Sequence, residues 1–234
     1  MPTTASLWWR PWHTVAGATM FHVDLAPHAD REARAFSLLD DEEKARWHRF
    51  LVPGAGRRFV LCRAALRINL AERLGCTNSQ LSFEYGEHGK PYALIDGRRA
   101  RTGFNVSHCG QHGLLVFASN DRIGIDVAER TPGRDLDGIG SLVYGPMERR
   151  LLSLASGQQK EHLFFRLWSM KEALIKALGS GFSLNPSGFE VPETMLRGAR
   201  SGEFRFPHAP SDSWHLIDLG EHRFAAAFAY RTSH

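Results

Sequence analysis

Residues 161–181 read EHLFFRLWSMKEALIKALGSG, and this stretch decides how the second half of the chain folds. Its apolar side chains recur at helical spacing and form one broad face: Leu163, Phe164, Leu167, Trp168, Leu174, Ile175 and Leu178. Gly179 follows, and glycine is common directly after a helix. The pattern predicts a long helix from about Glu161 to Leu178. At about 100° per residue, Ser169, Glu172 and Lys176 gather at one side of its apolar face.

A second long helix is predicted from about Arg57 to Leu74, and it ends at Gly75 in the same way. Shorter helices are predicted over Asp40 to Phe50 and Pro146 to Leu154. Alternating apolar and polar residues predict strands at Phe21 to Leu25, Leu81 to Tyr85, Gly103 to Ser107, Leu114 to Ser119, Ile123 to Val127, Glu203 to Phe206, Trp214 to Leu219 and Phe224 to Tyr230.

The two halves of the chain repeat one order of elements. A strand ending in aspartate, HVDL at 22–25 or GIDV at 124–127, leads to a short helix, a long helix closed by glycine, and more strands. This order indicates a duplicated unit. We expect an α/β fold of the α+β kind, a pseudo-dimer of two similar subdomains, each a small sheet packed on a long helix. The subdomains are expected to span residues 1–121 and 122–234, with the active site at their interface, because pockets favour such positions.

The composition is that of a globular protein, with 234 residues, 43% hydrophobic and 23% charged, and a net charge of +4. Of the 29 basic residues, only five are lysine. The arginine excess suggests an anionic partner, although codon usage alone would also produce it. No signal peptide or membrane-spanning run is recognised, and the three cysteines lack metal-ligand spacing. We therefore expect a cytoplasmic protein with no membrane partner and no zinc site.

A candidate metal and phosphate site combines the second long helix with the strand before it. Glu172 and Lys176 are i, i+4 neighbours, which by themselves could form an ordinary surface ion pair. Asp126 at the end of IGIDV could supply a second carboxylate, and Mg²⁺ is often held by one or two carboxylates with substrate phosphates and water. Ala128 stands two positions after Asp126, and Glu129 is expected to point to the other face of the strand.

Two further motifs could contact an anion. In GEHGKPYAL at 86–94, the turn Gly89–Lys90–Pro91 could bring backbone N–H groups to a phosphate or be a surface hairpin turn. In TGFNVSHCG at 102–110, Ser107 and His108 lie near a strand end. His108 could donate to an anion, act as a base or simply be packed.

The first long helix places Arg63 within its apolar stripe. A buried charge needs a partner, which could be an internal carboxylate or a bound phosphate. Other arginines crowd this region and could form a solvated face or a phosphate cradle: Arg46, Arg49, Arg57, Arg58 and Arg67.

Together these motifs resemble the 4'-phosphopantetheinyl transferases of the broad-specificity, surfactin-synthetase-activating type, over roughly residues 20–230. Three signatures appear in order: FNVSH at 104–108, GIDV at 124–127 and LWSMKEALIKALGSG at 167–181. GKP at 89–91 and EKARWHRF at 43–50 also look like their family counterparts. The resemblance implies a holo-[acyl-carrier-protein] synthase that transfers the 4'-phosphopantetheine arm of coenzyme A to a serine of an apo acyl or peptidyl carrier protein, releasing adenosine 3',5'-bisphosphate.

The resemblance also implies roles for individual residues. Arg46, Arg58 and His108 would contact the 3'-phosphate of coenzyme A, while the Gly89–Pro91 turn and Ser107 would line its adenosine end. Asp126 and Glu172 would hold Mg²⁺ against the pyrophosphate, with Lys176 as a further phosphate contact. Either Glu172, or Glu148 through water, would take the serine proton. Many members have an acid where this sequence has Ala128, so water is expected to complete the metal shell. Whether Arg63 and Lys171 touch the ligand is left open.

Two other functions are compatible with the sequence. The sequence pI of 9.2 would suit a nucleic-acid-binding module, although no recognised binding signature appears. A coenzyme A binder without transferase activity is the other, with Ala128 as its support. The carrier and its pathway are not identified, and we expect a monomer that binds no nucleic acid. The loop GFSLNPSGF at 181–189 could offer Phe182 and Leu184 to a carrier or pack them in the core.

Overall fold

The computed structural model describes residues 7–131, 133–181 and 184–232, and the chain divides into two compact units. Unit 1 comprises residues 1–87 and 91–120, and unit 2 comprises residues 88–90 and 121–234. The segment His88–Lys90 thus belongs to unit 2, although the residues on both sides of it belong to unit 1. Each unit is described by itself below.

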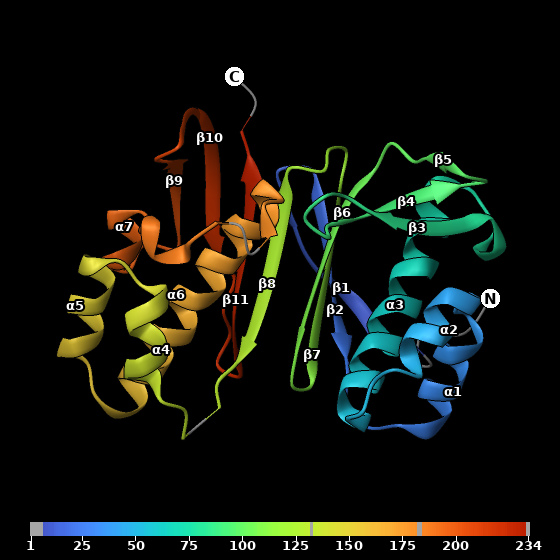
Figure 1. Cartoon of the computed structure of the whole chain (residues 1–234), viewed down its shortest axis with the longest axis horizontal. Helices are drawn as coiled ribbons and strands as arrows, with labels where there is room; N and C mark the ends of the chain where they lie inside the picture. Colours follow the sequence, from blue (N-terminus) through green and yellow to red (C-terminus); the bar gives the residue numbers. More distant parts are fainter. Residues whose placement is uncertain (1–6, 132, 182–183, 233–234) are drawn as a thin grey trace. The chain divides into compact units, whose positions relative to one another are not determined.

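Unit 1 is built on an antiparallel sheet of order β1-β2-β7-β6, which packs against helix α3 (Figure 1). Its main elements are β1 (Trp9–Val15), β2 (Ala18–Asp24), α1 (Ala29–Ser37), α2 (Asp41–Trp47), α3 (Pro53–Leu74), β6 (Gly103–Cys109) and β7 (His112–Ala118). A small second sheet contains β3 (Leu81–Tyr85), β4 (Pro91–Ile95) and β5 (Arg98–Arg99), preceded by a 3₁₀ turn at Asn78–Gln80. Leu61, Leu66 and Leu70 of α3 are fully buried in the core, as the helical spacing predicts.

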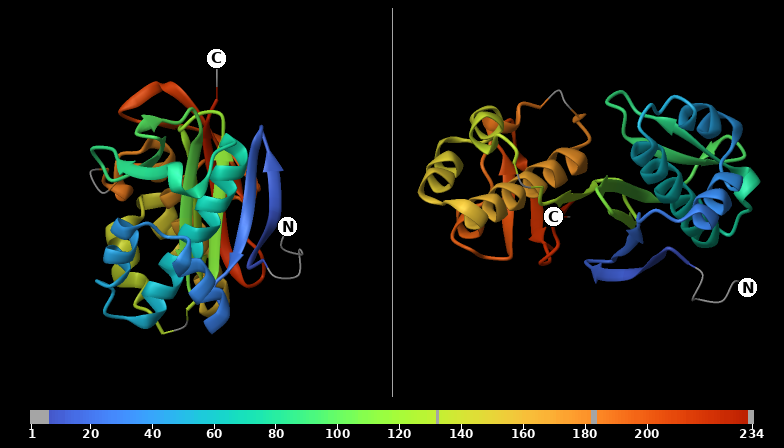
Figure 2. Two further views of the ribbon diagram at one scale, coloured as in Figure 1. Left: turned by 90° about the vertical axis from the view of Figure 1, so that its right-hand side faces the viewer. Right: turned by 90° about the horizontal axis from the view of Figure 1, so that it is seen from below.

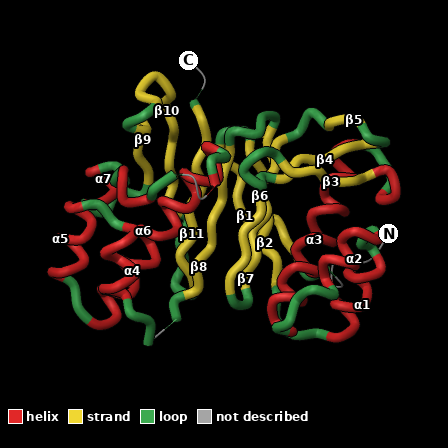
Figure 3. The backbone as a smooth tube through the Cα atoms, viewed as in Figure 1, coloured by secondary structure: helices red, strands yellow, loops and turns green. Residues whose placement is uncertain are grey.

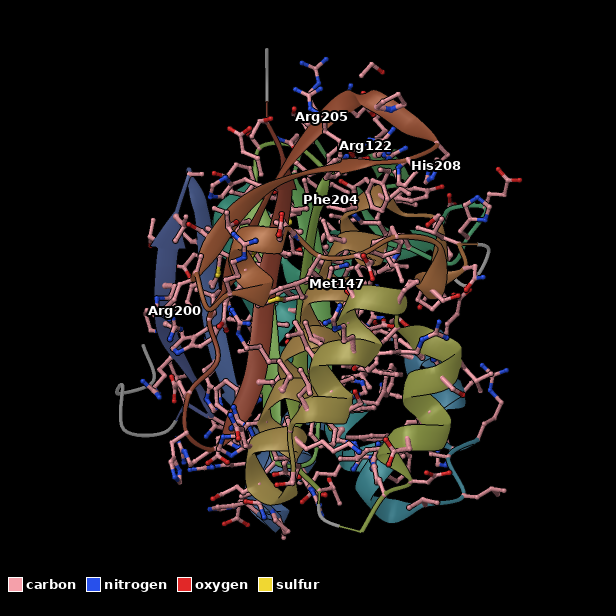
Figure 4. All side chains as sticks on the ribbon, turned by 90° about the vertical axis from the view of Figure 1, so that its left-hand side faces the viewer. Arg122, Met147, Arg200, Phe204, Arg205 and His208 are labelled. Atoms are coloured by element: carbon pink, nitrogen blue, oxygen red, sulfur yellow. The ribbon has the colours of Figure 1, made fainter. Side chains whose placement is uncertain are left out.

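Unit 2 is built on an antiparallel sheet of order β8-β11-β10-β9, and α6 lies along one face of it (Figure 2). Helices α4 and α5 pack against α6 (Figure 3). The elements are β8 (Ile123–Glu129), α4 (Leu136–Val143), α5 (Pro146–Leu154), α6 (Gly157–Leu178), a 3₁₀ turn at Pro186–Gly188, α7 (Glu193–Leu196), β9 (Ser201–Phe206), β10 (Ala209–Asp218) and β11 (Phe224–Arg231). Strand alternation is visible in β9, where Phe204 is buried and Arg205 is exposed (Figure 4).

The two units share one arrangement, which confirms the prediction of two similar subdomains. In each unit, the strand that precedes the long helix pairs with the unit's last strand, and this in turn pairs with the strand before it: β2-β7-β6 and β8-β11-β10. The long helices α3 and α6 each contain 22 residues and end at a glycine with positive φ, Gly75 and Gly179. The chain therefore has an α+β fold made of two similar subdomains.

The sequence patterns miss several elements. Strand β1 contains Pro11, which argues against a strand, but β1 lies at the edge of the sheet and its register shifts between Pro11 and His13. Strand β4 begins at Pro91, the last residue of GKP, and the sequence predicts no strand there. Helices α1, α4 and α7 are also absent from the predictions. Both long helices begin about four residues earlier than predicted, because their first turns lack apolar periodicity. Among the described helices, none combines the length and the apolar character that crossing a membrane requires.

Candidate active site

Gly124 brings α6 unusually close to β8. A Cβ atom on Gly124 would lie 2.2 Å from the carbonyl oxygen of Ala173 and 2.3 Å from the backbone nitrogen of Ala177. Real Cβ atoms essentially never come within 3.0 Å of such atoms, so only glycine fits beneath this helix. Asp126 lies two positions further along β8, on the face that Gly124 presents to α6. In GIDV, the glycine therefore allows α6 to pack closely on β8, and the aspartate faces α6.

Asp126, Glu172 and Lys176 meet on these two elements. Asp126 is only 4% exposed, and its Oδ1 atom lies 2.6 Å from Nζ of Lys176, which donates a hydrogen bond to it. Glu172 is half-buried one helical turn before Lys176. Burial raises the pKa of the Glu172 carboxyl, the negative charge of Asp126 raises it further, and Lys176 opposes both effects. Lys176 therefore pairs with Asp126 and acts on Glu172 only through its charge, so two acidic groups lie near one ammonium group, an arrangement that an added cation would stabilise.

The number of acidic side chains limits what could bind there. Within the described residues, no group of three or more His, Cys, Asp or Glu side chains is arranged to hold a metal ion. Ala128 points to the same face of β8 as Asp126 and packs in the apolar core of unit 2. A metal ion at Asp126 and Glu172 would therefore take its remaining ligands from water or from the oxygens of a substrate. Mg²⁺ tolerates such a shell, so the residues present fit it.

Glu148 occupies a different environment from the one its suggested role requires. Its carboxylate is fully buried and pairs with Lys171, whose Nζ lies 2.7 Å from Oε2. It also accepts hydrogen bonds from the backbone N–H groups of Gly145 and Val191, each at 2.9 Å. Lys171 is 1% exposed and donates a further bond to the carbonyl of Phe189. This pair joins α5, α6 and the segment before α7.

The sequence signal for the Lys171–Glu148 pair is a lysine on the apolar face of a helix. The helical wheel places Lys171 there, and a buried ammonium group needs a carboxylate partner. The sequence alone does not reveal that Glu148 is this partner.

Lys90 lies in unit 2 with its ammonium group among backbone carbonyls. Nζ donates hydrogen bonds to the carbonyl oxygens of Asp121 at 2.6 Å, Ile123 at 2.9 Å and Lys176 at 3.0 Å. Burial lowers the pKa of Lys90 to about 8, while the nearby charge of Asp121 acts in the opposite direction. The side chain therefore contacts the start of β8 and the last turn of α6.

The other expected ligand-binding residues belong to unit 1. The guanidinium group of Arg46 lies over the rings of Phe59 and Tyr85, and its Nη1 donates to the hydroxyl of Tyr85 at 2.7 Å. Arg46 also lines a hollow with Phe83 and Tyr85. Tyr85 is half exposed, and the sequence patterns gave no reason to single it out. Arg58 is half-buried on α3, next to Phe59. On β6, Ser107 is buried and His108 is exposed.

Two arginines of α3 have internal partners. Arg63 lies 3.5 Å from Glu43 through its Nε and stacks on Phe83, so its partner is an internal carboxylate. Arg67 is 1% exposed, and its guanidinium group donates to side chains of Asp40, Glu43 and Asn78 and to two backbone carbonyls. The interpretation of Arg67 as part of a solvated face or a phosphate cradle is therefore wrong.

Of the loop residues suggested as apolar anchors for a carrier, Phe182 lies outside the described residues. Leu184 packs partly buried against the core of unit 2.

Comparison with known proteins identifies the family. Residues 122–229 match the 4'-phosphopantetheinyl transferase superfamily, and residues 25–121 match the N-terminal domain of 4'-phosphopantetheinyl transferases. The 4'-phosphopantetheinyl transferase HetI of Nostoc sp. is 37% identical over 183 residues, covering 77% of this chain and 73% of that protein.

Two further relatives agree. A 4'-phosphopantetheinyl transferase of Bacillus subtilis is 31% identical over 172 residues, covering 73% of each chain. A protein of Synechocystis sp., named as a candidate 4'-phosphopantetheinyl transferase, is 39% identical over 147 residues, which cover 63% of this chain and 59% of its own length. The chain therefore belongs to the 4'-phosphopantetheinyl transferase superfamily, enzymes that transfer the 4'-phosphopantetheine arm of coenzyme A to a serine of a carrier protein.

Proposed function

We propose that this chain transfers the arm with Mg²⁺ held by Asp126 and Glu172. The observation that carries the proposal is the cluster of Asp126, Glu172 and Lys176, in which two partly desolvated carboxylates lie near one ammonium group that pairs with Asp126. Bound Mg²⁺ would neutralise charge on the pyrophosphate oxygens of coenzyme A. Lys176 would contact a phosphate oxygen from the same helix face.

The reaction is a displacement at phosphorus. The carrier serine oxygen forms a bond to the pantetheine-side phosphorus, and the bond from that phosphorus to the bridging pyrophosphate oxygen breaks. The leaving group is adenosine 3',5'-bisphosphate. Such a transfer depends on positioning and on stabilising the charge that develops on the leaving phosphate.

The serine proton goes to Glu172 in this proposal. Glu148 is the alternative base, but its carboxylate is fully buried, is paired with Lys171 and accepts two backbone N–H bonds. A base must reach the proton directly or through one water molecule. Glu172 is half-buried and lies beside Asp126, so it meets this requirement better.

The proposed contacts of coenzyme A extend beyond the carboxylate cluster. We assign the 3'-phosphate to Arg46, Arg58 and His108, and the adenosine end to Ser107 and the backbone of the Gly89–Pro91 turn. Of the residues assigned to the 3'-phosphate, Arg46 lines the hollow beside Tyr85, whose lining also includes Arg49 and the acidic Asp40, Glu42 and Glu43.

The partner is proposed to be an apo acyl or peptidyl carrier protein, met in the cytoplasm by a monomeric enzyme. The three cysteines are unpaired, as is usual in a reducing compartment. No observation favours a nucleic-acid ligand, because several arginines that suggested one, such as Arg63 and Arg67, have internal carboxylate partners.

The test is mass spectrometry of apo carriers from fatty-acid, polyketide, nonribosomal-peptide and lysine pathways, each incubated with the chain, coenzyme A and Mg²⁺. The expected result is a mass gain equal to one phosphopantetheine arm on at least one carrier, absent when Mg²⁺ is chelated. No gain on any carrier, with coenzyme A still bound, would instead support a binder without transferase activity.

A further inference from the structure

Lys90, the lysine of the GKP motif, belongs to none of the ion pairs described above. Its side chain ends among three carbonyl oxygens, those of Asp121, Ile123 and Lys176. An ammonium group has three protons, so each carbonyl can accept one, whereas a neutral amine could supply only two. The three acceptors therefore match the three donors of the charged form of lysine, although burial opposes that form.

Two of the three carbonyls belong to elements that carry the active site, and the third lies just before one of them. Asp121 and Ile123 lead into β8, which carries Asp126, while Lys176 lies in the last turn of α6, which carries Glu172. Carbonyls in the last turn of a helix lack partners within the helix and favour a nearby cation. Lys90 supplies both a donor and a positive charge at this end of α6.

Lys176 connects this contact to the carboxylates. Its backbone carbonyl accepts from Lys90, and its side chain donates to Asp126. Gly124 leaves no space between β8 and α6 into which a shift could be absorbed. A change in the position of the last turn of α6 would therefore move Lys176 relative to Asp126.

The glycines after α6 give Lys90 its position. Gly181 has a φ of +54°, and a Cβ on it would lie 2.9 Å from the carbonyl oxygen of His88. A Cβ on Gly179 would lie 3.6 Å from Cδ of Lys90. The GSG sequence that follows α6 thus packs directly against the His88–Lys90 segment. The end of the α6 motif and the start of the GKP motif are therefore in contact.

We propose that Lys90 is a positioning residue, which ties the start of β8 to the end of α6 and thereby sets the spacing of Asp126, Glu172 and Lys176. This inference rests on the proposed function of these three residues. In this proposal the Lys90 side chain binds backbone carbonyls of the protein. Of the Gly89–Pro91 turn, only the backbone then contacts coenzyme A.

The test compares Lys90→Met, which removes all three donors, with Lys90→Arg, which keeps the charge. The planar fork of arginine cannot direct protons to three converging carbonyls, so both variants should behave alike. Lys44→Met is the matched control, since Lys44 pairs with Asp41 at the surface at 3.7 Å. If Lys90→Met does not fold, Lys90→Gln replaces it.

Four quantities are measured. Hydrogen exchange should become faster in β8 and the last turns of α6, but not in β9. The affinity for Mn²⁺, followed by electron paramagnetic resonance in the presence of coenzyme A, should fall about tenfold. The kcat of transfer should fall about tenfold to hundredfold. The affinity for adenosine 3',5'-bisphosphate without metal should change less than about twofold, with the same salt dependence.

Other outcomes overturn the inference. If Lys90→Met loses bisphosphate affinity and Lys90→Arg retains it, while exchange in β8 is unchanged, Lys90 is a phosphate ligand. If exchange increases but kcat and Mn²⁺ affinity do not change, its role is only structural. If the wild-type chain modifies no carrier, the proposed function fails, and exchange together with Mn²⁺ affinity still decides whether Lys90 positions the site.

Discussion

Replacing Gly124 with alanine should disturb both stability and catalysis. The new Cβ would meet the Ala173 carbonyl oxygen at 2.2 Å and the Ala177 nitrogen at 2.3 Å. Because both atoms belong to the backbone of α6, no side-chain rotation can relieve the clash. Ordinary contacts need about 3.5 Å, so the helix must move away from β8 by roughly 1 Å. Overpacking of this kind costs about 1–3 kcal/mol of unfolding free energy.

The same movement separates Glu172 and Lys176 from Asp126. A displacement of roughly 1 Å in a positioned site can lower kcat about hundredfold. The assay measures the free energy of unfolding in urea and the kcat of transfer for Gly124→Ala. The control is Gly188→Ala, where a Cβ would meet nothing within 4 Å. Wild-type stability and kcat in Gly124→Ala would refute the close approach of α6 to β8.

Three further predictions concern buried groups. Replacing Lys171 with Met or Glu148 with Leu should each cost about 3–5 kcal/mol of unfolding free energy because a buried charge loses its partner, and the double variant should cost less than the sum; additive losses would contradict a direct pair. Burial raises the pKa of the Cys62 thiol to about 12, above its value of 9.0 in the unfolded chain, so the unfolded chain loses this proton first and stability falls between these pH values. The unfolding free energy of Cys62→Ser, measured in urea from pH 9 to 10.5, should fall with pH less steeply than that of the wild type, by about 1 kcal/mol per pH unit. An equal pH dependence in both proteins would show that the thiol ionises freely. Arg67→Lys should lower the unfolding free energy by about 3 kcal/mol because lysine cannot reproduce the forked bonds, whereas the exposed control Arg98→Lys should have little effect; equal stabilities would show that the fork is dispensable.

The periodic parts of the fold could be predicted from the sequence. The long helices and most strands of both sheets follow from apolar spacing, and Gly75 and Gly179 end their helices as expected. The elements that were missed depend on tertiary packing. Strand β1 tolerates Pro11 because it lies at a sheet edge, and α1 is a short helix with one fully buried residue, Ala35.

The site could be predicted only where the chemistry is local. Glu172 and Lys176 lie one turn apart on one helix, so helical geometry alone brings them together. Their approach to Asp126 depends on how α6 packs on β8, which the sequence does not state. The same holds for Lys171, whose partner Glu148 lies 23 residues away, and for Lys90, whose acceptors are backbone carbonyls and have no sequence signature.

The most direct test of the site is the metal dependence of Asp126→Asn. This variant keeps the size of the side chain but removes the charge that would hold Mg²⁺. Rates of transfer to an apo carrier are measured as Mg²⁺ is varied, with Asp137→Asn as the control, since Asp137 is exposed and pairs with Lys160. We predict at least about a hundredfold loss of kcat/KM for Asp126→Asn and little change for the control. Wild-type rates with an unchanged Mg²⁺ requirement in Asp126→Asn would contradict the proposed metal site.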